Sequence, residues 1–149
     1  MGNTYIFDLD GTLSLTEHRH HFLTDGQKPD WDAFFKAAKD DPPNPPVVTL
    51  FIKLVASGAD VRIWTGRSKA VYQDMLHWLN THHLFPSEII MRKATDHRPD
   101  TIIKKEWLDE FLINNKKEDI VCAFDDRDSV VKMWRDEGIV CFQVAEGNF

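Results

Sequence analysis

Short apolar runs alternate with amphipathic stretches along most of this 149-residue sequence. The apolar runs are mostly unbroken, which is typical of strands that helices cover on both faces. The stretches between them carry apolar residues at helical spacing, and a glycine follows two of them, as at many helix ends. The predicted strands are Thr4–Phe7, Ala59–Trp64, Glu88–Arg92, Ile120–Phe124 and Ile139–Val144, and the predicted helices are Val47–Ala56, Lys69–Thr81, Thr101–Asn114 and Asp128–Glu137.

This alternation predicts an α/β fold, a Rossmann-like parallel sheet of about five strands with helices on both faces. A chain of 149 residues suits one compact domain, so we expect residues 1–149 to form a single unit. Binding sites of such sheets form where the carboxyl ends of the strands meet. The residues that follow each strand are therefore the first place to look for chemistry.

One segment interrupts the alternation, between the first and second predicted strands. Residues 14–46 contain a helical pattern at Trp31–Lys39, capped by Asp30, and then the stretch DDPPNPP, which ends the helix and stiffens the chain. We expect a minimal cap-like insertion, too short for a second domain. Its aromatic residues Trp31, Phe34 and Phe35 fit the inner face of the cap helix, or alternatively a surface that stacks nucleobases.

Composition narrows the class of protein. Acidic residues outnumber basic ones by 24 to 18, and the net charge of −6 argues against a broad basic surface that coats nucleic acid, but not against binding of a strand end. Cys122 and Cys141 lie in apolar runs and fit reduced core residues better than a disulfide. No apolar stretch approaches the ~20 residues of a membrane span, and no secretory signal is visible. We therefore expect a cytoplasmic protein without a membrane partner.

Acids, a hydroxyl and several cations should converge at one edge of the sheet. Carboxylates packed together repel unless a cation neutralises them, and hard oxygen ligands suit Mg²⁺. Arginine and lysine side chains nearby suit a phosphate. The combination predicts Mg²⁺-assisted phosphoryl transfer. The residues concerned are Asp8, Asp10, Thr65, Arg67, Asp125, Asp126 and Arg127 after the strands, and Arg98, Asp100 and Lys104 around the start of the third helix.

The spacing of Asp8 and Asp10 suggests separate roles. Residues i and i+2 of a strand face the same side, and a turn at Gly11 would let Asp8 face phosphorus while Asp10 leans over the leaving oxygen. An aspartate can attack phosphorus and form an aspartyl-phosphate. A second carboxyl can protonate the leaving group and then deprotonate the attacking water. We therefore predict that Asp8 is the nucleophile and Asp10 the general acid and base.

Two alternatives remain open at this point. The histidines of HRHH at 18–21 and HH at 82–83 suggest zinc, but their spacing is not that of a closed zinc site and no cysteine lies near them. Lys105 could replace Lys104 as the catalytic amine. Asp100 favours Lys104, because an acid four residues earlier on a helix can hold its ammonium group.

Four motifs in this order resemble those of the haloacid dehalogenase superfamily of phosphotransferases. DLDGT matches the first motif, TGR the second, Lys104 the third and FDD the fourth. The resemblance implies Mg²⁺ as cofactor, bound by Asp8, the main-chain carbonyl of Asp10 and the acids of FDD. By resemblance to members with paired acids, Asp126 would bind the metal directly and Asp125 through water.

The last third of the chain, AFDDRDSVVKMWRDEGIVCFQVAEGNF, looks like the end of the phosphatase half of phage-type polynucleotide kinase/3′-phosphatase. This resemblance implies that Arg19 and Arg67 contact the phosphate, that Thr65 supplies a hydroxyl, and that Asp100 supports Lys104. Arg127 would stand behind these groups.

The resemblance implies a phosphatase that removes a 3′-phosphate from a polynucleotide end. The alternative within the superfamily is a nucleotidase or another small-molecule phosphatase, and a rival from another class is a non-catalytic binding module with the same fold. The 149 residues contain no G-x-x-x-x-G-K-[ST] motif, so we expect no kinase domain in them. The segment from Thr16 to Pro46 matches the phage-type family poorly apart from Arg19, and such caps usually select the substrate.

Overall fold

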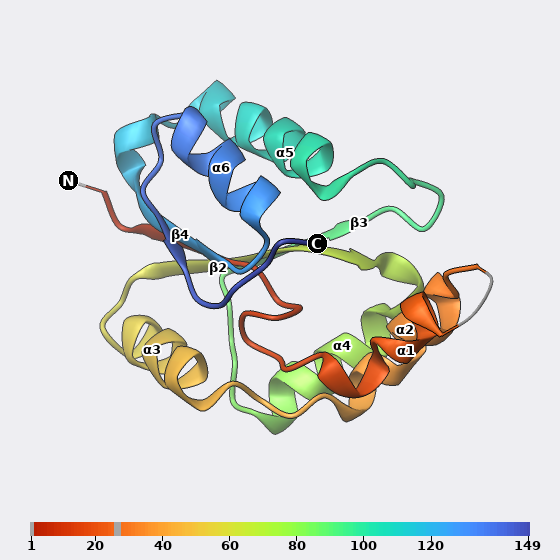
Figure 1. The fold of residues 1–149 in the computed structure, drawn as a ribbon. Helices are drawn as coiled ribbons and strands as arrows, with labels where there is room; N and C mark the ends of the chain where they lie inside the picture. The colour runs from red at the N-terminus through yellow and green to blue at the C-terminus, as the bar shows by residue number, and fades with distance from the viewer. Residues whose placement is uncertain (1, 26–27) are drawn as a thin grey trace.

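Five parallel strands form one central sheet in the computed structural model, which describes residues 2–25 and 28–149. The strand order is β3-β2-β1-β4-β5, so the chain builds outward on one side of β1 and then crosses to the other side (Figure 1). The strands are β1 (Thr4–Phe7), β2 (Asp60–Ser68), β3 (Glu88–Arg92), β4 (Ile120–Asp125) and β5 (Cys141–Gln143).

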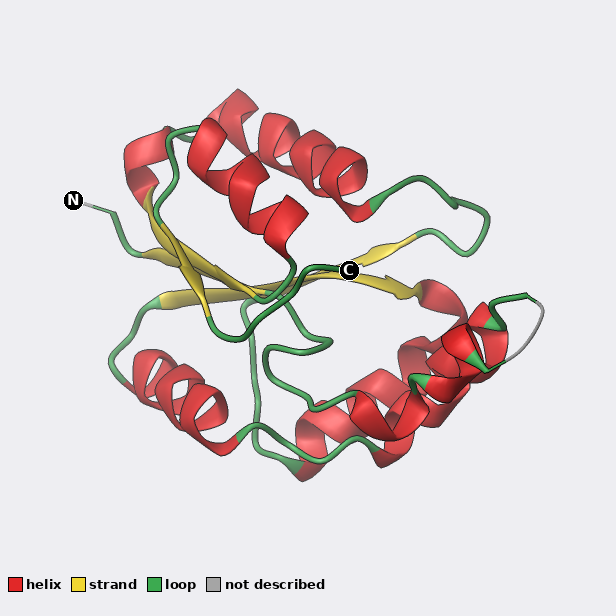
Figure 2. Cartoon of the chain, in the orientation of Figure 1, coloured by secondary structure: helices red, strands yellow, loops and turns green. Residues whose placement is uncertain are grey.

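Helices cover both faces of the sheet (Figure 2). Helices α3 and α4 lie against one face, and α5 and α6 lie against the other (Figure 1). The short helices of the insertion lie beside α4. The α-helices are α1 (His21–Thr24), α2 (Trp31–Lys36), α3 (Pro45–Ala56), α4 (Tyr72–Thr81), α5 (Asp100–Asn114) and α6 (Asp128–Asp136), and the 3-10 helices are η1 (Glu17–Arg19), η2 (Ala37–Asp40), η3 (Lys69–Val71) and η4 (Lys117–Asp119).

The sheet separates two hydrophobic cores, as the alternation of side chains along strands requires. On one side Phe7 and Ile63 pack with Phe51 of α3 and Met75 of α4. On the other side Trp64, only 1% exposed, packs with residues of α5 and α6. Cys122 belongs to the first core and Cys141 to the second, and both are free. The expected reduced cysteines therefore lie on opposite faces of the sheet.

The α/β fold predicted from the sequence is confirmed. Strands β1 and β3 have the predicted bounds, whereas β2 runs on to Ser68 because it continues to pair with β3 beyond a register shift after Thr65. Strand β5 is shorter than predicted. The predicted helix Trp31–Lys39 divides into α2 and η2, and the Asp30 carboxylate caps α2 by accepting a hydrogen bond from the Ala33 amide at 3.0 Å.

The insertion packs against α4 next to the end of β1. The indole Nε1 of Trp78 donates to the main-chain oxygen of Asp41 at 2.8 Å, and the Asn44 amide donates to the Leu13 oxygen at 2.8 Å. Phe34 is 7% exposed and faces inward, whereas Trp31 is 49% exposed, so the inner-face prediction was wrong for Trp31. Residues 26–27 of this segment lie outside the described residues.

Candidate active site

The carboxyl ends of β1 and β4 meet where the sheet reverses its winding. These strands are neighbours, but the helix that follows β1 covers one face and the helix that follows β4 covers the other. A crevice forms at such a reversal, and ligands of open α/β sheets bind there. Asp8 follows β1, Asp125 ends β4, and Asp126 follows it. The Asp8 amide donates to the Phe124 oxygen at 3.0 Å, which fixes the two strand ends together.

Three buried carboxylates gather at this point. Oxygens of Asp8, Asp125 and Asp126 all lie within 4.8 Å of one another, close enough to share one metal ion. Burial and the neighbouring Asp125 raise the pKa of Asp8 well above its usual value, and the same causes raise the pKa of Asp126 to about 6. Like charges so close are unfavourable without a cation between them, so this donor set fits a divalent metal.

Lys104 supplies a buried positive charge to the cluster. Its Nζ donates to Asp8 Oδ1 and to Asp125 Oδ2, each at 2.8 Å. Burial opposes the charge of the ammonium group, but Asp125 and Asp8 outweigh it and raise the pKa of Lys104. Lys105 points away from the site and pairs with Asp109 and Glu137. The structure therefore places Lys104, not Lys105, beside the carboxylates.

Asp125 also holds the loop after β4. Its Oδ1 accepts hydrogen bonds from the amides of Asp126 at 2.9 Å and Arg127 at 3.1 Å, while its Oδ2 is bonded to Lys104. Both oxygens of Asp125 are thus already engaged with protein donors. Asp126 makes fewer such bonds, and this leaves its carboxylate available to a metal.

The expected ion pair between Asp100 and Lys104 does not form. Asp100 bonds instead to Arg92 at the end of β3, and its Oδ2 lies 3.7 Å from Nη1 of Arg127. Helical spacing brought the two side chains onto one face, but Lys104 extends into the sheet edge toward stronger partners. Asp100 still acts on Lys104 through its charge, which helps to raise the pKa of the amine.

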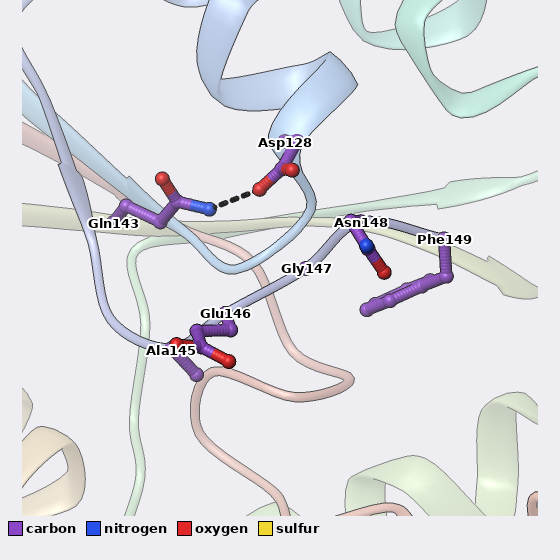
Figure 3. Close-up of a pocket in the computed structure, with 7 residues that line it drawn as sticks. All are labelled: Asp128, Gln143, Ala145, Glu146, Gly147, Asn148 and Phe149. Atoms are coloured by element: carbon purple, nitrogen blue, oxygen red, sulfur yellow. Dashed lines mark hydrogen bonds between the residues drawn. The ribbon is translucent and has the colours of Figure 1, made fainter.

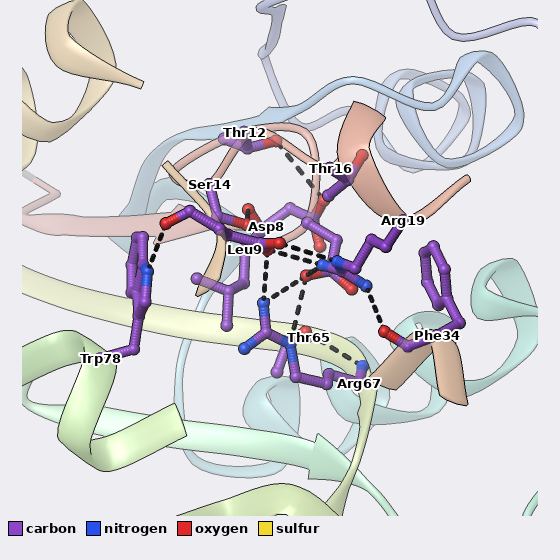
Figure 4. A network of polar contacts seen from close by, with 12 residues as sticks. Asp8, Leu9, Thr12, Ser14, Thr16, Arg19, Phe34, Thr65, Arg67 and Trp78 are labelled. Carbon is purple, nitrogen blue, oxygen red and sulfur yellow. Dashed lines mark hydrogen bonds and ion pairs between the residues drawn. The ribbon is translucent and has the colours of Figure 1, made fainter. Parts of the chain in front are cut away.

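Asp10 lies in a second cluster beside the first, where it pairs with Arg19 and Arg67. Figure 4 shows these two arginines. Its Oδ1 accepts hydrogen bonds from Arg19 Nη2 at 2.8 Å and from Arg67 Nε at 3.1 Å, and it also bonds to Arg67 Nη2. Burial would raise the pKa of Asp10, but Arg67 and Arg19 outweigh burial and lower it to about 2. Asp10 is therefore bonded to the arginines and held ionised.

The expectation that Arg19 contacts a phosphate does not fit the structure. Arg19 is completely buried, and its guanidinium group is bonded to Asp10, to Asp41 and to the Phe34 oxygen. Cζ of Arg19 also lies over the Phe34 ring, 4.2 Å from the ring centre. Arg19 therefore holds Asp10 from behind. Arg67 is also buried, but no described residue bonds to its Nη1.

Asp41 completes this cluster, and the sequence analysis missed it. Its carboxylate is fully buried and accepts from Arg19 Nε at 2.8 Å and Nη2 at 2.7 Å, while Arg67 Nη2 lies 3.5 Å away. His18 bonds to it from the solvent side at 2.6 Å. Two acids thus balance two arginines. Asp41 stands in a proline-rich linker with no motif around it, so only a search for acids able to neutralise Arg19 could have found it.

Gly11 allows the first motif to pass close to the carboxylate of Asp126. Its φ is +80°, a backbone conformation that other residues rarely adopt, and a Cβ there would lie 2.1 Å from Asp126 Oδ2. The glycine of the first motif is therefore favoured for two reasons, the positive φ of the turn and the closeness of Asp126. A side chain at residue 11 would push the Asp126 carboxylate away from its place beside Asp8.

The other predicted groups lie around this edge. The Thr65 hydroxyl is buried in β2 and accepts a hydrogen bond from the Arg67 amide at 3.0 Å. Arg127 is partly exposed, with its Cζ 4.8 Å from the centre of the Phe149 ring. The histidine-based zinc alternative finds no support, because the only cluster of metal ligands in residues 2–25 and 28–149 is the aspartate triad, and His18 and His20 bond to Asp41 and Thr16.

The fold and these two charged clusters define a phosphatase of the haloacid dehalogenase type. Comparison with known proteins identifies the family within this superfamily. The model of the family described as the polynucleotide kinase PNKP phosphatase domain matches residues 2–149, and the chain belongs to this family. The protein is therefore a phosphomonoesterase domain.

Solved structures agree with this assignment. A chain of the Pnkp1/Rnl/Hen1 complex aligns with a TM-score of 0.78 and 33% identity over 99% of this chain and 48% of its own length. A chain of the Pnkp1/Rnl/Hen1 RNA repair complex aligns with a TM-score of 0.79 and 33% identity, over 98% of this chain and 43% of its own length. CbbY from Rhodobacter sphaeroides, solved with phosphate, shares the fold. It is 16% identical and aligns with a TM-score of 0.66 over 100% of this chain and 88% of its own length.

A viral protein is also similar. It is described as a bifunctional polynucleotide kinase/RNA ligase of Autographa californica nuclear polyhedrosis virus, and is 28% identical over 132 residues, 87% of this chain and 17% of the relative. The chain thus spans less than half of the matching chains of these two complexes and a small part of the viral protein. None of the helices in the described residues has the length and apolar character to cross a bilayer.

Proposed function

We propose that this domain hydrolyses the terminal 3′-phosphate of a polynucleotide, with RNA ends as the first candidate substrate. The observation that carries the proposal is the pairing of a nucleophile-and-metal cluster at Asp8 with a separate acid/base cluster at Asp10, two residues along the chain. The RNA repair complex that contains a similar chain, and the viral polynucleotide kinase/RNA ligase, support a nucleic-acid end as substrate.

In the first step, an Asp8 carboxylate oxygen attacks phosphorus and the bond from phosphorus to the 3′-oxygen breaks. Asp10 gives its proton to the departing oxygen. In the second step, water attacks the aspartyl-phosphate, its proton passes to Asp10, and the bond between phosphorus and Asp8 breaks. Lys104 keeps Asp8 oriented and offsets negative charge on the transferred group.

The arginines beside Asp10 favour its ionised form, which is the form that accepts a proton from water. Donation to the leaving group requires Asp10 to be protonated first. An incoming phosphate opposes the effect of the arginines, because a nearby negative charge raises the pKa of a carboxyl group. Arg67, whose Nη1 no described residue engages, is the guanidinium group that we assign to the phosphate.

A divalent cation, for which we propose Mg²⁺, would be held by Asp8, Asp126 and the main-chain oxygen of Asp10, with Asp125 behind them. When bound, Mg²⁺ neutralises the carboxylates and draws negative charge from the phosphate oxygens. The burial and raised pKa values of Asp8 and Asp126 are what a site built for a cation should show.

The size of the insertion favours a polymer. Large caps enclose small substrates and exclude bulk water. Here the insertion has only the residues 14–46, and its short helices lie beside α4. With a net charge of −6, contacts further along a strand should be few, and the salt dependence of binding should be shallow.

The test is a substrate panel with Mg²⁺, comparing 3′-phosphorylated RNA and DNA oligonucleotides, the same oligonucleotides with a 5′-phosphate, and 3′-mononucleotides. We expect the highest kcat/KM on a 3′-phosphorylated oligonucleotide and poor turnover of the 5′-phosphate. Asp8→Asn keeps the shape of the side chain but removes the nucleophile, and should abolish turnover of every substrate. If mononucleotides are preferred by tenfold or more, about 1.4 kcal/mol, the domain is a nucleotidase.

A further inference from the structure

The C-terminal segment, residues 144–149, returns to the active edge after β5. The main-chain amide of Val144 donates to the main-chain oxygen of Asp125 at 3.1 Å, and the main-chain amide of Asp128 donates to the main-chain oxygen of Gly147 at 2.8 Å. Gln143 Nε2 donates to the main-chain oxygen of Asp126 at 3.0 Å. Hydrogen bonds thus tie the segment to the loop that carries Asp126, the proposed metal ligand. The segment therefore lies next to Asp126 and Arg127.

Gly147 brings the segment as close to this loop as main chain can come. A Cβ on Gly147 would lie 1.9 Å from the Asp126 oxygen and 2.8 Å from Cα of Arg127. Any side chain at position 147 would push the last residues off the loop. The close contact therefore fixes where Phe149, two residues later, can lie relative to Asp126.

A groove of about 640 Å³ opens along this segment (Figure 3). The side chains of Asn148 and Phe149 project to the same side of the segment. Arg127 covers one face of the Phe149 ring, with its Cζ 4.8 Å from the ring centre, and Phe149 as a residue is nevertheless 66% exposed. An aromatic ring held by a cation on one face and free on the other is a platform for stacking.

The charges around the groove indicate which part of a nucleotide it takes. Asp128 and Glu146 line it together with the amide side chains of Gln143 and Asn148. Carboxylates repel a phosphate, whereas amides and carboxylates exchange hydrogen bonds with the edges of bases. A phosphate-bearing strand therefore does not run along the groove, but the flat, uncharged base of a nucleotide fits it.

We propose that Phe149, braced by Arg127, forms a nucleobase subsite for the nucleotide that carries the terminal phosphate. This inference rests on the proposed function and adds to it the group that recognises the end nucleotide. Stacking of a base on an aromatic side chain tolerates any sequence, because every base has a flat face. The subsite should therefore distinguish a nucleotide from a base-free phosphate ester without selecting one base.

The experiment compares two 3′-phosphorylated oligonucleotides that differ only in the last nucleotide, which is normal in one and abasic in the other. The measured quantity is the ratio of kcat/KM for the normal over the abasic substrate. We expect Phe149→Ala to lower this ratio about tenfold, Phe149→Leu to lower it nearly as much, and Phe149→Trp to keep or raise it. The effect should lie mostly in KM, because the platform holds substrate and does not touch the reacting atoms.

Phe85→Ala is the matched control. Phe85 is 57% exposed and precedes β3, at the opposite edge of the sheet, so its removal should leave the ratio at the wild-type value. If wild type hydrolyses the oligonucleotide and Phe149→Ala keeps the wild-type ratio, the subsite is wrong and the proposed function stands. If wild type shows no activity on either oligonucleotide but hydrolyses mononucleotides, the proposed function and the subsite both fall.

Discussion

At the scale of single residues, the site consists of two neighbouring charge clusters with different tasks. One contains the carboxylates of Asp8, Asp125 and Asp126 with one lysine, and burial together with the neighbouring charge of Asp125 raises the pKa of Asp8 and of Asp126, as expected where a cation fits. The other contains Asp10 and Asp41 with two arginines and is already neutral. The first cluster suits metal and phosphate, and the second suits control of one carboxyl group.

Lys104 and Lys105 offer a matched pair for testing the first cluster. Lys104→Ala removes the lysine that is bonded to Asp8, and kcat should fall by roughly 10²–10³, the usual cost of losing one electrostatic contact to the transition state. Mg²⁺ affinity should stay near normal or rise, because a repelling charge is gone. Lys105→Ala, which touches only surface acids, should retain kcat. Steady-state kinetics over a Mg²⁺ titration measures both quantities, and equal losses in the two variants would contradict the assignment.

Asp41 should matter for activity although it lies behind the reacting groups. Asp41→Asn leaves Arg19 buried without its main partner, and breaking a buried ion pair costs about 3–5 kcal/mol. We expect a lower melting temperature and a reduced kcat with little change in Mg²⁺ affinity, because Asp10 loses its fixed position while the metal cluster is untouched. Thermal unfolding and aryl phosphate turnover are the measurements.

The exposed neighbour Asp40 provides the control for this prediction, and Asp40→Asn should behave as wild type. Asp41→Glu restores the charge and should recover part of the stability. A folded Asp41→Asn variant with normal kcat would show that Asp41 has no part in positioning Asp10.

At the scale of elements, the loops that follow β1 and β4 are shaped by each other. Gly11 and Gly58 both have positive φ, +80° and +85°, but only Gly11 faces a neighbour, Asp126, whereas nothing lies within 4 Å of a Cβ at Gly58. The strain of a left-handed alanine, roughly 1–2 kcal/mol, is common to both positions. The difference between the two alanine variants therefore isolates the contact with Asp126.

Gly58→Ala should lower stability by about that amount and leave Mg²⁺ activation unchanged. Gly11→Ala should cost more stability and also weaken Mg²⁺ activation, because Asp126 must move. Denaturant unfolding and the Mg²⁺ dependence of turnover separate the two effects. Similar Mg²⁺ dependence in both variants would mean that the close approach of these loops does not position the metal ligand.

At the scale of the whole molecule, the buried acids should link stability to pH and to metal. The folded-state pKa of Asp126, about 6, lies above the unfolded value of 3.8, so between these pH values the folded protein binds more protons than the unfolded chain. Without metal, the contribution of Asp126 is therefore fully favourable below about pH 4 and is lost as pH rises through about 6.

In chelator, the melting temperature of wild type should thus fall relative to Asp126→Asn as pH rises from about 4 to 7. Each 1 kcal/mol corresponds to roughly 2–4 °C for a domain of this size. Mg²⁺ should raise the wild-type melting temperature near pH 7, where the acids are charged, and should do less for the variant. A chelator should also stop turnover, and full activity in chelator would contradict the metal assignment.

The sequence by itself determined the larger part of this protein. Unbroken apolar runs between helical patterns predicted the α/β sheet, because strands buried on both faces leave that pattern in any chain. Asp8, Asp10, Lys104 and the acids Asp125 and Asp126 could be found because each lies at or shortly after a strand end or within the first turns of a helix at the active edge. These residues depend on local position, which sequence carries.

Only the tertiary structure decided how the charged side chains are paired. Lys104 bonds to Asp8 and Asp125 rather than to Asp100, and Arg19 turns inward to Asp41 rather than toward a phosphate. The exposure of Trp31 and the platform at Phe149 were likewise invisible in the sequence. A long charged side chain can reach several partners, and the choice among them depends on burial and distances that arise only when segments far apart in the chain pack together.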